Sequence, residues 1–504
     1  MATLCYSGLS SLFKAKGKKR SPRQEVHAEE CSKFILVNSK RSVDDIYVPE
    51  KTLGVGGFGT VRKCLSRKTG AMFVMKSIIK DEIPDVVKFQ TEIEIQAELD
   101  HPHIVRLYET FENHSAIDIV LEVCLGGTTD KRVTNASTFD EAVICRLFKQ
   151  IMSGVYFMHD HANIAHRDLK PENILIKEDP RIPLADATCK IIDFGLSARF
   201  QPGTRSFKDM CGTPFWAAPE VFSGHKYNEK CDIFSCGMIL HNYLCADLPY
   251  DEKLSFICDK TGFTQRPVFS FRSEAWTRVS PSAKVLILQM CKVKPDERPS
   301  PHQVLSDSAW VKQHDFDEAD TTLQTETVCE IATSLSRYST LDLLQKTALI
   351  AIANVAEHEW DEDIAKARAT FKQLDPLGSG SVDLQMFREH FMAWMRKLEN
   401  ESETRPSLAE VDNLFKAVDI KSDGHFHFSE WLAANLPRHS YLEEHHCWEA
   451  FRIFDKDGCG HISKDDLFKM LGENAATLKL LETHDTDDCG ELTFDEFMDM
   501  LRSI

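Results

Sequence analysis

Eight residues, His166 to Asn173, hold an acid, a cation and an amide at spacings that suit one kind of chemistry. Transfer of a phosphoryl group to a hydroxyl needs a carboxylate that orients the hydroxyl and accepts its proton. It also needs a cation against the phosphate oxygens and oxygen ligands for magnesium. Asp168, Lys170 and Asn173 supply these groups in that order, so we predict that all three are catalytic and that Asn173 also binds Mg²⁺.

A second magnesium ligand is expected downstream, and Asp193 fits this expectation. It opens Asp-Phe-Gly directly after the apolar pair Ile191-Ile192, at a spacing that predicts a two-stranded hairpin between Asn173 and Asp193. An isolated Asp in a polar loop is usually a solvated turn residue, but the whole set in this order is the pattern of a kinase. The stretch resembles the eukaryotic protein kinases.

Glycines upstream form a candidate cradle for phosphate. The run from Gly54 to Val61 carries a GxGxxG pattern, in which the backbone approaches phosphate oxygens without a Cβ clash. The pattern alone is weak evidence because glycine hairpins are common. Its weight comes from Lys76, which ends a β-patterned run, and from its expected counter-ion Glu92. Glu94 is the rival counter-ion, but the kinase pattern favours Glu92.

The resemblance to kinases implies which residues surround the nucleotide. An apolar strand, here residues 117–123, is expected to run into a hinge whose backbone hydrogen-bonds adenine. Leu121 is the expected gatekeeper, and three aliphatic residues would sandwich the base, although such residues belong to the core in most folds. The predicted nucleotide-binding residues are Gly54, Gly56, Gly59, Val61, Val74, Lys76, Glu92, Leu121, Glu122, Val123, Leu175 and Asp193.

The resemblance leaves two points open around the substrate. Many kinases that prefer basic substrates carry Glu directly after paired glycines, whereas this chain has Thr128, so that preference is not carried over. Arg167 is the cation that often meets a phosphate on the activation loop. Asp209 either supplies a fixed negative charge in its place or is an exposed loop acid.

The second half of the chain repeats one loop pattern four times, starting at Asp375, Asp419, Asp455 and Asp485. Each loop has glycine at position 6 and an apolar residue at position 8. An EF-hand uses oxygens at positions 1, 3, 5 and 9, a backbone carbonyl at 7 and a bidentate acid at 12. The repeat therefore predicts two pairs of EF-hands, with a short β bridge between the position-8 residues of each pair.

All four loops depart from the ligand rule. The first loop has Leu377 at position 3 and Met386 at position 12, so we predict that it is empty. The second has Lys421 at position 3, and a cation there opposes calcium. The third has Cys459 at position 5 and a short acid at position 12, which favours magnesium-like coordination. The fourth has only one poor position, Cys489, so we rank it first.

The predicted metal ligands follow from these loops and from the catalytic stretch. For magnesium they are Asn173 and Asp193. For the EF-hand loops they are Asp485, Asp487, Cys489, Glu491 and Glu496 in the fourth, Asp455, Asp457 and Asp466 in the third, and Asp419, Asp423 and Glu430 in the second.

Length and composition limit the remaining possibilities. The 504 residues suggest roughly three domains. A formal net charge of -18 argues against a nucleic-acid partner. The 16 cysteines contain no CxxC pair, and no apolar stretch is long enough to span a membrane, so we expect a cytoplasmic protein without a transmembrane segment. A basic N-terminal tail predicts a flexible segment; weak contact with a membrane surface and nuclear targeting are the alternatives.

A kinase pattern, a helical stretch from about residue 325 to 356 and two EF-hand pairs, in this order, resemble the calcium-dependent protein kinases. The resemblance implies a multidomain fold, an α+β bilobal protein kinase followed by an all-α EF-hand domain of the calmodulin type. The expected parts are a flexible basic tail, the kinase domain, a junction or autoinhibitory segment and two EF-hand pairs. Their respective bounds are 1–45, 46–312, 313–357, 358–437 and 438–504.

The resemblance also implies an enzyme that uses ATP, Mg²⁺ and Ca²⁺ to phosphorylate protein Ser/Thr hydroxyls. Lys170 and Thr213 favour Ser/Thr over Tyr. The apolar run 341–355 predicts a contact between the junction helix and the EF-hands, either as a calcium-released inhibitor or as a permanent strut. Two other interpretations remain: a constitutive kinase with structural EF-hands, and a catalytically silent kinase-like scaffold. The intact catalytic set argues against the scaffold.

Overall fold

The computed structural model describes residues 36–38, 42–56, 59–83, 85–134, 140–249, 258–259, 262–263, 269–314, 325–356, 362–397, 407–456 and 458–504. Most of the predicted N-terminal tail lies outside these residues. The short helix α3 (Val43–Ile46) is described, and Val43 is buried in one cluster with Tyr47 and Phe73. The packed part of the chain therefore begins slightly before residue 46.

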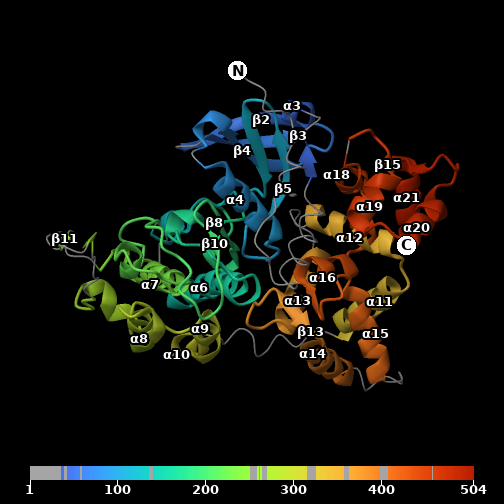
Figure 1. The fold of residues 1–504 in the computed structure, drawn as a ribbon. Coiled ribbons are helices and arrows are strands. Elements are labelled where there is room, and N and C mark those ends of the chain that lie inside the picture. The colour runs from blue at the N-terminus through green and yellow to red at the C-terminus, as the bar shows by residue number, and fades with distance from the viewer. Residues whose placement is uncertain are drawn as a thin grey trace.

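A six-stranded sheet forms the upper lobe of the first half (Figure 1). Its strands, in spatial order, are β1 (Leu36–Asn38), β5 (Leu107–Glu112), β6 (Ala116–Leu121), β4 (Met72–Ile79), β3 (Gly59–Ser66) and β2 (Tyr47–Gly56). Among the described strand pairs of this sheet, β1–β5 is parallel and the others are antiparallel. Asp85 caps the N-terminus of helix α4 (Val86–Glu98). The helix buries Phe89 and Ile93 against the sheet. This packing brings the helix that carries Glu92 next to the strand that carries Lys76.

The lower lobe is mainly helical and buries a large apolar core. Its α-helices are α5 (Thr129–Thr134), α6 (Glu141–Tyr156), α7 (Lys230–Cys245), α8 (Pro281–Met290), α9 (Pro301–Asp307) and α10 (Ala309–Gln313). Its short strands are β7 (Ile164–Ala165), β8 (Ile174–Ile176), β9 (Cys189–Ile191), β10 (Ala198–Arg199), β11 (Cys258–Asp259) and β12 (Gly262–Phe263). The hairpin predicted between the two magnesium-ligand motifs is confirmed, because β8 pairs antiparallel with β9.

The C-terminal half consists of helices joined by short strand pairs. The first EF-hand pair contains α13 (Glu362–Leu374), β13 (Ser381–Asp383), α14 (Leu384–Lys397), α15 (Leu408–Val418), β14 (His425–His427) and α16 (Phe428–Ala434). Helix α17 (Arg438–Tyr441) leads to the second pair, with α18 (Glu444–Phe454), β15 (Ile462–Ser463), α19 (Lys464–Leu471), α20 (Ala475–His484), β16 (Glu491–Leu492) and α21 (Phe494–Arg502). The predicted β bridges are confirmed: Val382 lies opposite Phe426, and Ile462 lies opposite Leu492.

The junction contains two helices where the sequence predicts one helical stretch. Helix α11 (Thr325–Ser339) ends before Thr340, and helix α12 (Leu343–Ala356) starts after Asp342. Asp342 and Gln345 exchange side-chain-to-backbone hydrogen bonds of 2.9 and 3.1 Å, which is the reciprocal arrangement of a capping box. Asp342 therefore starts a new helix and breaks the continuous one.

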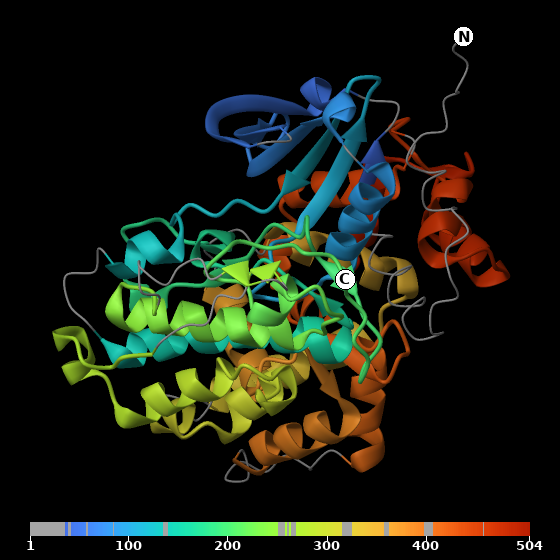
Figure 2. The same ribbon diagram turned by 60° about the vertical axis from the view of Figure 1, so that its left-hand side comes forward.

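Helix α12 lies in the middle of the C-terminal half. Its residues belong to the same buried cluster as the EF-hand helices, and it packs against α16 and α18. Figure 1 shows the first EF-hand pair beside the helical lobe and the second pair beside the sheet. Figure 2 shows the sheet above the helical lobe from another side. Among the residues that the structure describes, no helix is both long and apolar enough to cross a membrane.

Candidate functional site

The catalytic stretch predicted from the sequence forms one connected set of hydrogen bonds. Lys170 Nζ lies 2.8 Å from Asp168 Oδ2 and 2.7 Å from Thr213 Oγ1. Thr213 donates to the other oxygen of Asp168 at 2.6 Å. Asn173 Nδ2 donates to the Asp168 carbonyl at 2.8 Å. The carboxylate is therefore fixed on several sides, and the Asn173 amide oxygen remains as the candidate metal ligand.

A buried carboxylate, Asp232, holds the backbone of this stretch. It accepts hydrogen bonds from the N–H groups of His166 and Arg167, both at 2.8 Å, and from His159 at 2.9 Å. Burial alone raises the pKa of Asp232, but these hydrogen bonds and the nearby histidines outweigh it and hold the pKa below its usual value. Arg167 has a positive φ of 67°, a backbone conformation that residues other than glycine rarely adopt, and the hydrogen bonds to Asp232 hold it in place.

Lys76 lies between its predicted counter-ion, Glu92, and the predicted magnesium ligand Asp193. Its Nζ is 3.4 Å from Glu92 and 3.7 Å from Asp193. Burial alone lowers the pKa of Lys76, but the two carboxylates outweigh it and raise the pKa, so the ammonium stays charged. Phe194 is buried beside the His166 ring, with ring centroids 5.2 Å apart. Asp193, the residue before Phe194, points towards Lys76.

The predicted nucleotide-binding residues line up along neighbouring strands. Val61 pairs with Lys76, and Val74 pairs with Leu121 at the end of β6. A Cβ on Gly54 would meet no described atom within 4 Å, which leaves room for a phosphate. A Cβ on Gly59 would lie 1.9 Å from the Ser77 carbonyl oxygen, so this glycine is also required for strand packing.

The hinge residues differ in what they offer. Glu122 is buried, and its carboxylate lies 2.8 Å from Lys190 and 3.4 Å from Lys177. Its side chain is therefore engaged in ion pairs, which leaves the hinge backbone as the part suited to adenine. Val123 is half-buried beside it, and Leu175 on β8 bridges to Thr128. Gly56 ends β2, where it pairs with Gly59 of β3.

The contacts of Asp209 and Arg167 distinguish between the two interpretations of Asp209. Arg167 donates to the Leu196 carbonyl at 2.7 Å and lies over the Phe207 ring, 4.9 Å from its centroid. Asp209 instead lies 3.8 Å from Lys88 of α4, and both side chains are mostly exposed. In this structure Asp209 thus forms a surface pair with α4 and does not pair with Arg167.

The fourth EF-hand loop brings several predicted ligands together. One candidate ligand atom from each of Asp485, Asp487 and Cys489 lies within 4.8 Å of the others. Glu496 is buried in the loop, where Thr486 and Thr493 donate hydrogen bonds to its carboxylate. Burial opposes ionisation of Glu496, but these hydrogen bonds outweigh it and lower its pKa to about 2.

The fourth loop can therefore present an ionised acid at position 12, which suits a calcium site. Its position-5 thiol has another partner. Cys489 donates to the carbonyl of Glu491 at 3.2 Å, and that carbonyl is the predicted ligand at position 7.

The third loop repeats this arrangement with a shorter acid. The thiol of Cys459 donates to the His461 carbonyl at 3.3 Å, as Cys489 does to Glu491. Asp455 accepts hydrogen bonds from the N–H groups of Cys459 and Gly460, both at 2.9 Å. Asp466 is buried at position 12, and Asp457 lies outside the described residues. The shorter acid at position 12 therefore distinguishes the third loop from the fourth.

The first two loops are less suited to a metal. In the second loop, Asp419 accepts from Asp423 N–H, and Asp423 lies 3.3 Å from His427 at position 9. Burial raises the pKa of Glu430 to about 8. In the first loop, burial raises the pKa of Asp375 to about 6. Both acids therefore favour protonation more than Glu496 does.

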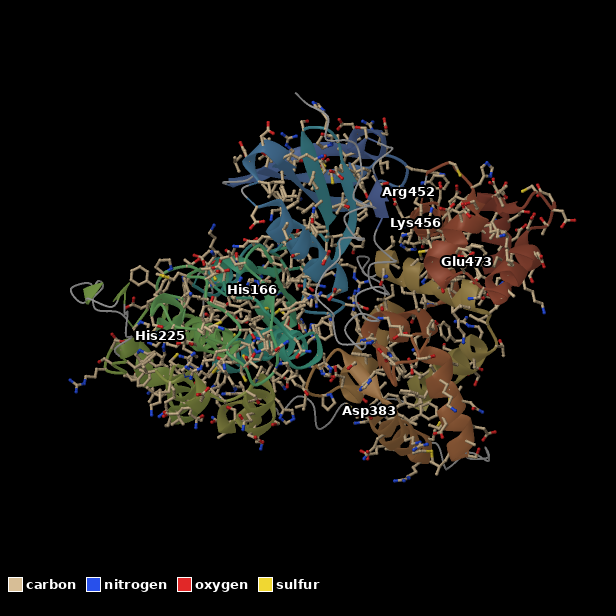
Figure 3. The ribbon with its side chains drawn as sticks, in the orientation of Figure 1. His166, His225, Asp383, Arg452, Lys456 and Glu473 are labelled. Atoms are coloured by element: carbon tan, nitrogen blue, oxygen red, sulfur yellow. The ribbon has the colours of Figure 1, made fainter. Side chains whose placement is uncertain are left out.

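A buried contact between the two halves was not predicted from the sequence. Arg452 of α18 lies 2.9 Å from Glu109 of β5 and 2.7 Å from Glu449, and Tyr47 donates a hydrogen bond to Glu109. Figure 3 labels Arg452 where the second EF-hand pair faces the sheet. Nearby, Lys68 Nζ lies 2.9 Å from the centroid of the Trp448 ring. No local pattern indicates this network, because Arg452 and Glu109 are 343 residues apart in the sequence.

Comparisons with known proteins agree with this geometry. A family model described as protein kinase domain matches residues 47–311, and one described as EF-hand domain matches residues 446–475. Calcium-dependent protein kinase 5 of Plasmodium falciparum (isolate 3D7) is 31% identical over 479 residues, covering 94% of this chain and 80% of the relative. Calcium-dependent protein kinase 32 of Arabidopsis thaliana is 30% identical over 485 residues, covering 94% and 85%.

Proposed function

The chain belongs to the calcium-dependent protein kinases, and from this premise we propose that it transfers the γ-phosphoryl group of ATP to protein Ser and Thr hydroxyls under the control of calcium. The observation that carries the proposal is the contact of Lys76 with both Glu92 and Asp193, beside the fixed carboxylate of Asp168. A silent scaffold has no need for these contacts together.

The proposed roles follow from the geometry. Asp168 orients the acceptor hydroxyl and takes its proton while the oxygen bonds to the γ-phosphorus and the bond to the leaving ADP breaks. Lys76 and Lys170 contribute positive charge, and Gly54, Gly56 and Gly59 bring backbone near the phosphates. When bound, Mg²⁺ would neutralise negative charge on the phosphate oxygens. Asn173 and Asp193 are the residues that would hold it.

We further propose a division of the chain into a tail, a kinase domain, a junction and two EF-hand pairs, at residues 1–45, 46–312, 313–357, 358–437 and 438–504. The kinase-model match to residues 47–311 supports the second of these. Calcium would bind chiefly at the fourth loop, more weakly at the third and second, and not at the first. A cytoplasmic location completes the proposal, with contact of the basic tail with a membrane surface and nuclear targeting as the alternatives.

One experiment tests the proposal against its two alternatives. Phosphate transfer to matched peptides containing Ser, Thr or Tyr would be measured with calcium and with a chelator, using Asp168→Asn as the inactive control. We expect transfer to Ser and Thr that depends on calcium. Equal transfer in chelator would identify a constitutive kinase with structural EF-hands, and no transfer above Asp168→Asn would identify a scaffold.

A further inference from the structure

The position-3 residues that make the first two EF-hand loops poor calcium sites lie against the kinase half. Leu377, at position 3 of the first loop, packs against the core of the helical lobe. Lys421, at position 3 of the second loop, lines a cavity of about 180 Å³ together with Asp100 and Arg106 of the kinase half. Position 3 is a ligand position in a calcium loop. In both loops it faces the kinase half instead.

The first loop makes direct hydrogen bonds to the kinase half through a backbone carbonyl. The Gly378 oxygen accepts from Ser153 Oγ at 2.7 Å and from His101 Nε2 at 3.1 Å. His103 N–H donates to His101 Nδ1, which leaves the proton on Nε2. Burial lowers the pKa of His101 to about 3, so the ring is neutral. The contact is therefore a fixed hydrogen bond between uncharged groups.

Glycines allow this close approach. A Cβ on Gly378 would lie 2.1 Å from Ser153 Oγ, and one on Gly380 would lie 2.7 Å from the His101 ring. Gly424 occupies the same position 6 in the second loop, with a similar positive φ, but a Cβ there would meet no described atom within 4 Å. Position 6 thus requires glycine for the turn in both loops and for contact with the kinase half only in the first.

The second loop reaches the same segment of the kinase half. Ser429, at position 11, donates to Asp100 at 2.5 Å, and Arg106 donates to the other oxygen of Asp100 at 2.6 Å. Burial raises the pKa of Asp100, but Arg106, Lys421 and the Ser429 hydrogen bond outweigh it and keep the carboxyl ionised. Arg106 also donates to Asn354 of α12. Both loops and the junction helix therefore meet the segment 100–106, which connects α4 to β5.

We infer that the first EF-hand pair is a docking module, in which the two loops bind the segment 100–106 and helix α6 of the kinase half, and that docking rather than calcium binding is their main role. The docked contact is present with and without calcium, because none of its groups needs the metal. Calcium responses are then expected chiefly from the second pair. The inference concerns a contact within the chain and holds whether or not the proposed phosphate transfer is correct.

Hydrogen–deuterium exchange on the full chain tests this inference. In the wild type, we expect amides of residues 100–106 and 150–158 to exchange at rates within about twofold of each other in calcium and in chelator. Gly380→Ala should accelerate them by about tenfold or more, because the new Cβ collides with His101. Gly424→Ala is the matched control, with the same backbone strain but no collision, and should leave these amides unchanged.

A second variant keeps the inference testable if Gly380→Ala does not fold. Leu377→Ser removes the apolar contact without a residue at positive φ, and should also accelerate exchange at 100–106 and 150–158. The inference is overturned if wild-type protection disappears in chelator, if Leu377→Ser keeps full protection, or if Gly380→Ala and Gly424→Ala behave alike.

Discussion

The catalytic cleft and the four EF-hand loops differ in how their functional groups are arranged. In the cleft, Asp168, Lys170 and Thr213 contact one another, so each group is positioned by the others. The loops depart from the ligand pattern to different degrees: the fourth loop has one poor position, whereas the first also lacks the acid at position 12. Phosphoryl transfer needs all its groups together, whereas metal affinity changes in steps with ligand number.

The largest effect is expected in the cleft, from Asp168→Asn. An amide cannot accept the hydroxyl proton, and loss of a general base typically costs about 10²–10⁴-fold in rate. Steady-state kinetics should show this loss in kcat, while ATP affinity changes little because the Lys76 contacts remain. A variant with kcat near that of the wild type would show that the cleft tolerates the loss of one group as the loops do.

The second largest effect is expected where helix α18 of the second EF-hand pair meets the sheet, from Arg452→Ala. Glu109 and Glu449 would be left buried without their cation, at a cost of about 3–5 kcal/mol. We expect the second EF-hand pair to separate from the sheet, which small-angle X-ray scattering would detect as a larger radius of gyration. Arg438→Ala is the control, because that arginine is exposed and donates within the C-terminal half. An unchanged radius would show that Lys68 and Trp448 suffice.

The contacts that the sequence predicts are those encoded by short spacings. The hairpin between Asn173 and Asp193 and the β bridges of the EF-hand pairs follow from local patterns, and the structure contains them. The Arg452 network and the docking of Gly378 join distant parts of the chain, so no local pattern specifies them. One signal was present: Leu377 and Lys421 are unexpected at ligand positions, and both lie against the kinase half.

A smaller effect is expected in the loops, from Glu496→Gln. The neutral amide supplies one oxygen where the carboxylate supplies two, so calorimetry on the full chain should show the tightest calcium site weakened by more than about tenfold. Glu430→Gln is the matched control at the same position of the second loop. If Glu430→Gln weakened calcium binding as much, the ranking of the fourth loop over the second would be wrong.

The smallest effect is expected at position 5 of the loops in the second EF-hand pair, and it compares the third loop with the fourth. Cys489 occupies ligand position 5, and its thiol donates to the Glu491 carbonyl at position 7. Cys489→Asp would add a hard oxygen ligand and release that carbonyl, so we expect the fourth loop to bind calcium about three- to tenfold more tightly in titrations of the full chain. Cys459→Asp makes the same change in the third loop, where Asp466 is one carbon shorter than Glu496 and should limit the gain. Equal gains in both loops would mean that position 5 limits affinity more than position 12. No gain in either loop would mean that the side chain at position 5 does not contribute to metal binding. The number of oxygen ligands would then not explain the order of calcium affinity among the loops.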